Sequence, residues 1–188
     1  EFSNVLIDGH GTANYYAERG VRIISGSAKF KNVTWANNYT NEGLILISNS
    51  NVEFENNLFI DNSSGSQQRG FIHINSSSTV SVINSSLVNN LDVTNGYQRN
   101  ELIRFNGSDS KLVLINSVMG DMGSQDLQIS ENSSGGNNAV YARNSVLPNL
   151  GLTTSNNFIW DVDASNVFQD PQLDSDGKLM ANSPAIGI

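Results

Sequence analysis

The chain has 188 residues, a net charge of −8 and an isoelectric point near 4.5. This acidity argues against nucleic acid and anionic membranes as partners, and no apolar run is long enough to insert into a membrane. The chain has no cysteine, which excludes a disulfide-stapled fold. Its length suits a single domain.

A short frame recurs along the chain. Each copy has an apolar residue, an Asn two positions later, a large apolar residue three positions further on, and usually an Asn or Asp two after that. The clearest copy is Phe54, Asn56, Phe59 and Asp61. The first Asn of the frame recurs in steps of 28, 24, 28, 32 and 28 residues, at Asn4, Asn32, Asn56, Asn84, Asn116 and Asn144. Such a period indicates a solenoid.

Within each repeat, apolar and polar residues alternate as in half-buried strands. A second apolar segment precedes most copies of the frame, at residues 45–48, 72–75, 103–106 and 127–130. Three short strands joined by polar corners predict an all-β fold, a parallel β-helix of about five to six coils. In-register stacking places like residues together, so the six Asn residues of the frame are expected to form an inward ladder of amide hydrogen bonds.

Insertions and the tail deviate from this period. Loops at 8–20, 38–43, 63–70 and 90–100 fall at one corner and are expected along one edge. Residues 150–188 lack the coil period and are predicted to cap the last coil. The prediction is therefore residues 1–149 as coils and 150–188 as a capping segment of the same domain. The first coil has no evident cap, so we expect the rest of a larger polypeptide N-terminal to it.

Several motifs resemble those of known β-helices. The stretches 35–38 with 43–45 (Trp-Ala-Asn-Asn, Gly-Leu-Ile) and 59–62 with 70–72 (Phe-Ile-Asp-Asn, Gly-Phe-Ile) are similar to repeats of polymorphic outer-membrane adhesins. The tail, with Phe-Gln-Asp-Pro at 168–171 and Asn-Ser-Pro-Ala-Ile-Gly at 182–187, resembles the closing motif of bacterial secreted β-helix proteins. The whole chain resembles the right-handed parallel β-helices of the pectate-lyase-like superfamily. This resemblance implies right-handed coiling and an extracellular or bacterial cell-surface location.

A basic cluster is the most distinctive local pattern in this acidic chain. Arg69 and Arg99 end the long loops of consecutive coils, and His73 and Arg104 lie at the outward position of the strands that follow. Stacked cations about 5 Å apart favour an anion between them, such as a uronate or a sulfated sugar. The alternative is a surface ladder neutralised by nearby carboxylates.

Aromatic residues divide between two expected roles. Tyr15, Tyr16 and Tyr97 fall on the long-loop corner, where exposed rings could serve as sugar platforms or could simply pack within the loops. Trp35 and Phe59 occupy an inward column and are interpreted as core.

Acidic residues give two weaker patterns. Asp61 and Asp121 lie two coils apart, about 9–10 Å, near the upper limit for an inverting glycosidase pair. Alternation of Asn and Asp at this corner fits turn chemistry better. Asp174 and Asp176 resemble the start of a Ca²⁺ loop, but no further ligands follow, so a plain turn is the preferred interpretation. No cofactor is expected, with Ca²⁺ as the alternative.

The prediction for function is an extracellular module of a larger secreted or surface protein that binds a polysaccharide, a cell-surface glycan or another surface. No coherent catalytic set is readable, so catalysis is not expected. The alternatives are a polysaccharide lyase or hydrolase that acts on acidic glycans through Arg69, His73, Arg99 and Arg104, and a structural spacer without ligand.

Overall fold

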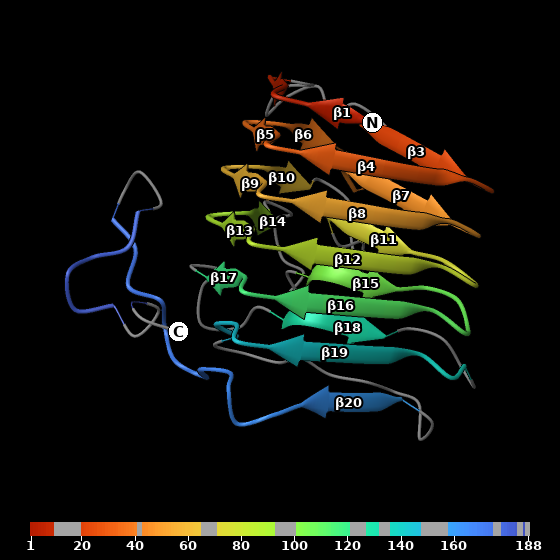
Figure 1. The fold of residues 1–188 in the computed structure, drawn as a ribbon. Helices are drawn as coiled ribbons and strands as arrows, with labels where there is room; N and C mark the ends of the chain where they lie inside the picture. Colours follow the sequence, from red (N-terminus) through yellow and green to blue (C-terminus); the bar gives the residue numbers. More distant parts are fainter. Residues whose placement is uncertain are drawn as a thin grey trace.

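The computed structural model describes residues 1–9, 20–40, 43–64, 71–92, 101–120, 127–131, 136–147, 158–174, 178–183 and 186. Within these ranges the regular elements are all β-strands, and they form a parallel β-solenoid of about four turns (Figure 1). This confirms the predicted fold class with slightly fewer turns than expected. The described ranges contain no helix long and apolar enough to cross a membrane.

The strands stack in four sheets, each named here by its first strand. The β1 sheet contains β1 (Phe2–Ser3), β4 (Ser27–Lys31), β8 (Asn51–Glu55), β12 (Thr79–Ile83), β16 (Lys111–Ile115), β19 (Ala139–Arg143) and β20 (Ile159–Val162). The β2 sheet contains β2 (Leu6–Asp8), β5 (Thr34–Ala36), β9 (Leu58–Ile60), β13 (Ser86–Val88) and β17 (Val118–Gly120). The β3 sheet contains β3 (Val21–Ile24), β7 (Ile45–Ser48), β11 (Ile72–Ile74), β15 (Glu101–Phe105) and β18 (Leu127–Glu131), and the β6 sheet contains β6 (Tyr39–Thr40), β10 (Ser63–Ser64) and β14 (Leu91–Asp92).

The core consists of stacked columns of like side chains. Phe30 pairs with Phe54 across β4 and β8, and their rings stack with centroids 5.3 Å apart. Trp35 and Phe59 stack in the same way across β5 and β9, at 5.4 Å and 8°. All four side chains are buried, which confirms the predicted core role of Trp35 and Phe59.

A left-handed residue recurs at each of three corners. These residues have positive φ values between 49° and 67° and align in three columns: Asn4, Asn32, Asn56, Asn84, Asn116 and Asn144; Gly9, Asn37, Asp61 and Asn89; Ser25, Asn49, Ser77 and Asp109. Asn and Asp adopt this conformation more readily than other residues with a Cβ. The turn interpretation of Asp61 is therefore confirmed, whereas Asp121 lies outside the described residues.

The predicted Asn ladder forms between three of its five neighbouring pairs, and it lies on the outside. Asn32 Nδ2 donates to Asn4 Oδ1 (3.1 Å), Asn56 Nδ2 to Asn32 Oδ1 (2.6 Å) and Asn116 Nδ2 to Asn84 Oδ1 (3.1 Å). These side chains are exposed, so the predicted inward orientation is wrong. The left-handed residue interrupts the alternation of the strand, and the residue after it faces the interior instead.

Three inward columns carry most of the buried polar groups of the described residues. The first column consists of the residues that directly follow the ladder Asn residues in sequence. In it, the backbone N–H of Asn57 donates to Ser85 Oγ (2.9 Å), and that of Ser117 donates to Ser145 Oγ (3.1 Å). At the second corner, Asn62 Nδ2 donates to Asn90 Oδ1 (2.8 Å), and Asn38 Nδ2 donates to Asn62 Oδ1 (2.8 Å). At the third corner the column is Ser50, Ser78, Ser110 and Asn138. Each coil is thus joined to the next by satisfied buried polar groups.

The C-terminal segment adds one more rung and then leaves the solenoid. β20 pairs with β19, and Phe158 and Trp160 pack against the core. The chain then passes outside the β2 sheet, where a Cβ added to Gly120 would clash with Pro171 (Figure 1). The predicted boundary at residue 149 lies outside the described residues.

Candidate binding face

The outer face of the β1 sheet carries polar side chains in straight rows. Strict parallel register aligns Ser27 with Asn51 and Thr79, and Lys29 with Glu53 and Ser81. Neighbouring strands are roughly 4.8 Å apart. A row therefore offers one polar group per rung at a nearly constant spacing.

These rows border an open depression of about 450 Å³, called here the polar depression. Its lining consists of Glu1, Ser27, Ala28, Lys29, Asn51, Val52, Glu53, Thr79 and Ser81. Because the lining comes mainly from three hydrogen-bonded strands, its shape is fixed by the fold.

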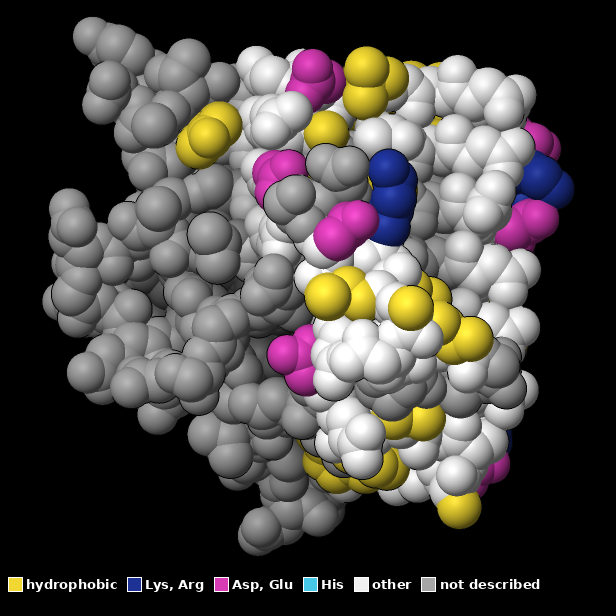
Figure 2. Space-filling view, turned by 90° about the vertical axis from the view of Figure 1, so that its left-hand side faces the viewer, with side chains coloured by type: hydrophobic (Ala, Val, Ile, Leu, Met, Phe, Trp, Pro, Cys, Tyr) yellow, Lys and Arg dark blue, Asp and Glu magenta, His cyan; other side chains and the backbone are white. Residues whose placement is uncertain are grey.

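A charge cluster lies partly in the lining of the polar depression and partly beside it. Lys29 Nζ contacts Glu53 Oε1 at 2.7 Å and Glu55 Oε2 at 2.6 Å, and Lys31 Nζ contacts Glu55 Oε1 at 2.8 Å. Hydrogen bonds from Lys29 and then Lys31 lower the pKa of Glu55 to about 2. Hydrogen bonds to Glu53 and Glu55 raise the pKa of Lys29 above its ordinary value. Glu55 and Lys29 therefore stay charged at ordinary pH, and each makes ion pairs with its neighbours in the cluster. In Figure 2 the outer face of the β1 sheet lies along the right-hand edge, where charged side chains are visible.

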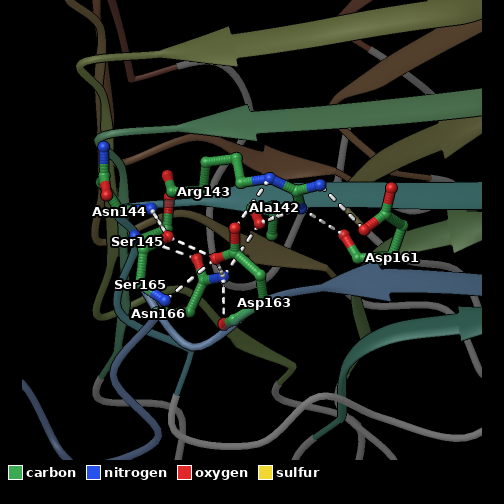
Figure 3. Close-up of polar contacts among 8 residues, drawn as sticks. All are labelled: Ala142, Arg143, Asn144, Ser145, Asp161, Asp163, Ser165 and Asn166. Carbon is green, nitrogen blue, oxygen red and sulfur yellow. Dashed lines mark hydrogen bonds and ion pairs between the residues drawn. The ribbon is translucent and has the colours of Figure 1, made fainter.

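A second ionic cluster fixes the last rung (Figure 3). Arg143 Nη2 contacts Asp161 Oδ1 at 2.8 Å, and Arg143 Nε contacts Asp163 Oδ2 at 3.0 Å. Hydrogen bonds from the Ser165 hydroxyl and backbone N–H, more than the charge of Arg143, lower the pKa of Asp163. Asn166 continues the inward column, since its Oδ1 accepts from the Ser145 N–H at 3.0 Å. The connected bonds indicate a structural role in joining β20 to β19.

His73 and Arg104 lie side by side as the sequence predicted. They are register partners on β11 and β15, in the β3 sheet. Their side chains are only 4% and 6% exposed. The two groups therefore lie next to each other, but their side chains are too buried to bind a polymer at the surface.

The other predicted site residues fall mostly outside the described ranges. Arg69, Arg99, Tyr15, Tyr16, Tyr97 and Asp176 are among those not described. Asp174 is described, and its Oδ1 accepts a hydrogen bond from the Lys178 N–H at 2.9 Å. In the described part of the chain, no group of three or more His, Asp or Glu side chains could hold a metal ion.

Sequence reasoning missed the polar depression, although one signal was present. Lys29 and Lys31 lie 24 residues before Glu53 and Glu55, the same step that separates Asn32 from Asn56. Opposite charges at matching positions of adjacent coils predict cross-strand ion pairs on the outer face.

No known protein family, no curated protein and no solved structure matches this chain. The resemblance to pectate-lyase-like β-helices and to adhesin repeats therefore rests on the sequence motifs alone.

Proposed function

We propose that the protein is a carbohydrate-binding β-solenoid module that holds a polysaccharide chain in the polar depression of the β1 sheet. The observation that carries this proposal is the parallel rows of hydroxyl and amide groups on rigid strands, around an open depression. As the sequence motifs suggest, the module belongs to a larger secreted or surface protein and acts outside the cell.

The chemistry of the lining supports a glycan as the ligand. Ser27, Thr79 and Ser81 each provide one hydroxyl donor and two acceptor lone pairs, and Asn51 provides an amide donor and a carbonyl acceptor. Sugar hydroxyls need this mixture of donors and acceptors. A linear polymer also gains from groups that repeat along the solenoid axis, because successive sugar units can meet successive rungs.

The same observations bear on the two alternatives. A spacer without ligand would be expected to have a smooth outer surface, and the polar depression favours binding instead. A lyase or hydrolase for acidic glycans would depend on Arg69, His73, Arg99 and Arg104, and the two described members of that set are buried. Binding without catalysis is thus the better-supported proposal.

A polysaccharide panel with immobilised wild-type protein tests the proposal. At least one polymer is expected to bind, and the triple variant Asn51→Ala, Thr79→Ala, Ser81→Ala is expected to weaken that binding at least tenfold. Ser86→Ala, which changes a half-buried Ser on β13 in the β2 sheet, is the matched control and should leave affinity unchanged. Absence of binding across the panel, or equal binding by the triple variant, would refute the proposal.

A further inference from the structure

We infer that the polar depression selects neutral, hydroxyl-rich polysaccharides over acidic ones. This inference rests on the proposed function and differs from the acidic glycan that the basic cluster of the sequence favoured. It depends on the charges that line the depression and on the contacts that those charges already make.

The fixed charges of the lining are unfavourable for an anionic ligand. The charged side chains of the lining comprise two carboxylates, Glu1 and Glu53, and one ammonium group, Lys29. The whole chain carries a net charge of −8, which adds a long-range repulsion for polyanions at low ionic strength.

The ammonium group is already occupied. Lys29 Nζ lies 2.7 Å from one Glu53 oxygen and 2.6 Å from one Glu55 oxygen. A sugar carboxylate would either use the third N–H of Lys29, beside the carboxylates of Glu53 and Glu55, or displace one of them and leave it without a counter-charge. Lys31, in the next row, is likewise bound to Glu55 at 2.8 Å. Lys111 pairs with Thr79 across β12 and β16, one strand beyond the lining.

Neutral sugars meet none of these penalties. The hydroxyl groups of Ser27, Thr79 and Ser81 can reorient to donate or accept, and so can match a sugar hydroxyl without disturbing the ion pairs. Selectivity then follows from a cost imposed on the wrong ligand as much as from contacts to the right one.

Matched polymer pairs test the inference directly. One pair is galacturonan with its carboxyl groups methyl-esterified or free, and another is dextran with or without carboxymethyl groups. At about 20 mM salt, wild-type protein is expected to bind the neutral member of a pair at least tenfold more tightly. The difference should shrink as salt screens the repulsion.

The double variant Glu53→Gln, Glu55→Gln removes the carboxylates that occupy Lys29 and Lys31. Its preference for the neutral member should fall to near unity or reverse. The control Asp8→Asn, Asp61→Asn removes two charges at or beside the second corner, where Asn keeps the acceptor used by Asn37 and tolerates the left-handed backbone. This control should keep the wild-type preference, and melting curves of both variants establish that they fold.

Three outcomes would count against the inference. Tighter binding of the acidic member by wild-type protein at low salt would overturn the selectivity while leaving glycan binding intact. An equal change of preference in the double variant and in the control would exclude the Lys29 cluster as its cause. Binding of neither member of any pair would overturn the proposed function together with this inference.

Discussion

The two ends of the solenoid differ in how well their apolar side chains are covered. Here the end at β1 is called the open end, and the end at β20 is called the closed end. At the first rung, Phe2 stacks on Phe30 with centroids 5.0 Å apart, yet 55% of Phe2 is exposed, as is 63% of Leu6. At the last rung, β20 supplies Phe158 and Trp160, which pack against the core, and Phe158 meets Phe105 at 5.4 Å. The comparison teaches that the last rung packs its aromatic side chains against the core, whereas the first rung leaves large apolar side chains exposed.

The largest test of this comparison uses one aromatic column. Phe54→Ala removes a fully buried ring from the middle of the column and should lower the free energy of unfolding by about 3–5 kcal/mol. Phe2→Ala removes a half-exposed ring from its end and should cost less than about 1 kcal/mol, because little apolar surface is lost. Urea unfolding measures both. An equal loss for the two variants would mean that the first rung is covered in solution.

The inward polar column gives the next largest effect. Asn166→Ala at the closed end should cost about 1–3 kcal/mol, because the Ser145 N–H and the Ala142 carbonyl oxygen lose their partner. Val5 begins the same column at the open end, and 37% of it is exposed. Val5→Ala should therefore be nearly neutral. Thermal melts of the two variants would contradict the comparison if their order were reversed.

The outer Asn ladder should respond equally at the end and in the middle, because its requirement is local. Asn4 and Asn84 have φ values of 55° and 50°. An Ala at either position should cost about 1–2 kcal/mol through the left-handed backbone. A Gly at Asn84 should restore most of that loss, although it also lacks the ladder amide. If Gly lowers the stability as much as Ala does, the loss comes mainly from the ladder hydrogen bonds and not from the left-handed backbone.

The smallest effect is the acid sensitivity of the two ionic clusters. The pKa of Glu55 falls from its ordinary value of 4.5 to about 2 in the folded protein. The stability from this group is fully present above about pH 4.5 and is lost as pH falls toward 2. Glu55→Gln should flatten the decline of melting temperature across that window. Asp163→Asn at the closed end should act in the same direction, since the pKa of Asp163 is also lowered. If the melting temperature of both variants declined at low pH as in the wild-type protein, these clusters would be excluded as the cause of that decline.

The stacking of coils could be predicted from the sequence, but side-chain orientation at the corners could not. The repeat placed Phe30 with Phe54 and Trp35 with Phe59, because parallel register follows directly from the spacing. The ladder of Asn residues was assigned to the wrong side, because one left-handed residue reverses which neighbour faces inward. β20 was not predicted because residues 159–162 lack the Asn frame.

The candidate site was harder to predict than the fold. His73 and Arg104 were correctly placed together, yet their burial was not predicted, because spacing does not reveal how exposed a side chain is. The uncharged polar lining of the polar depression consists of Ser, Thr and Asn residues, which look ordinary in a chain rich in them. Only the cross-strand register shows that they form rows.

The register also determines how the protein responds to force. Paired residues on consecutive rungs from β1 to β19 are 24 to 32 positions apart, as in Ser27 with Asn51 and Thr79 with Lys111. Each rung must therefore close a loop of that length before its strands gain partners, which makes folding slow. Tension applied at the exposed first rung would release the chain one rung at a time. A force–extension trace should therefore show regularly spaced steps, from the rung of Phe2 to the rung of β20.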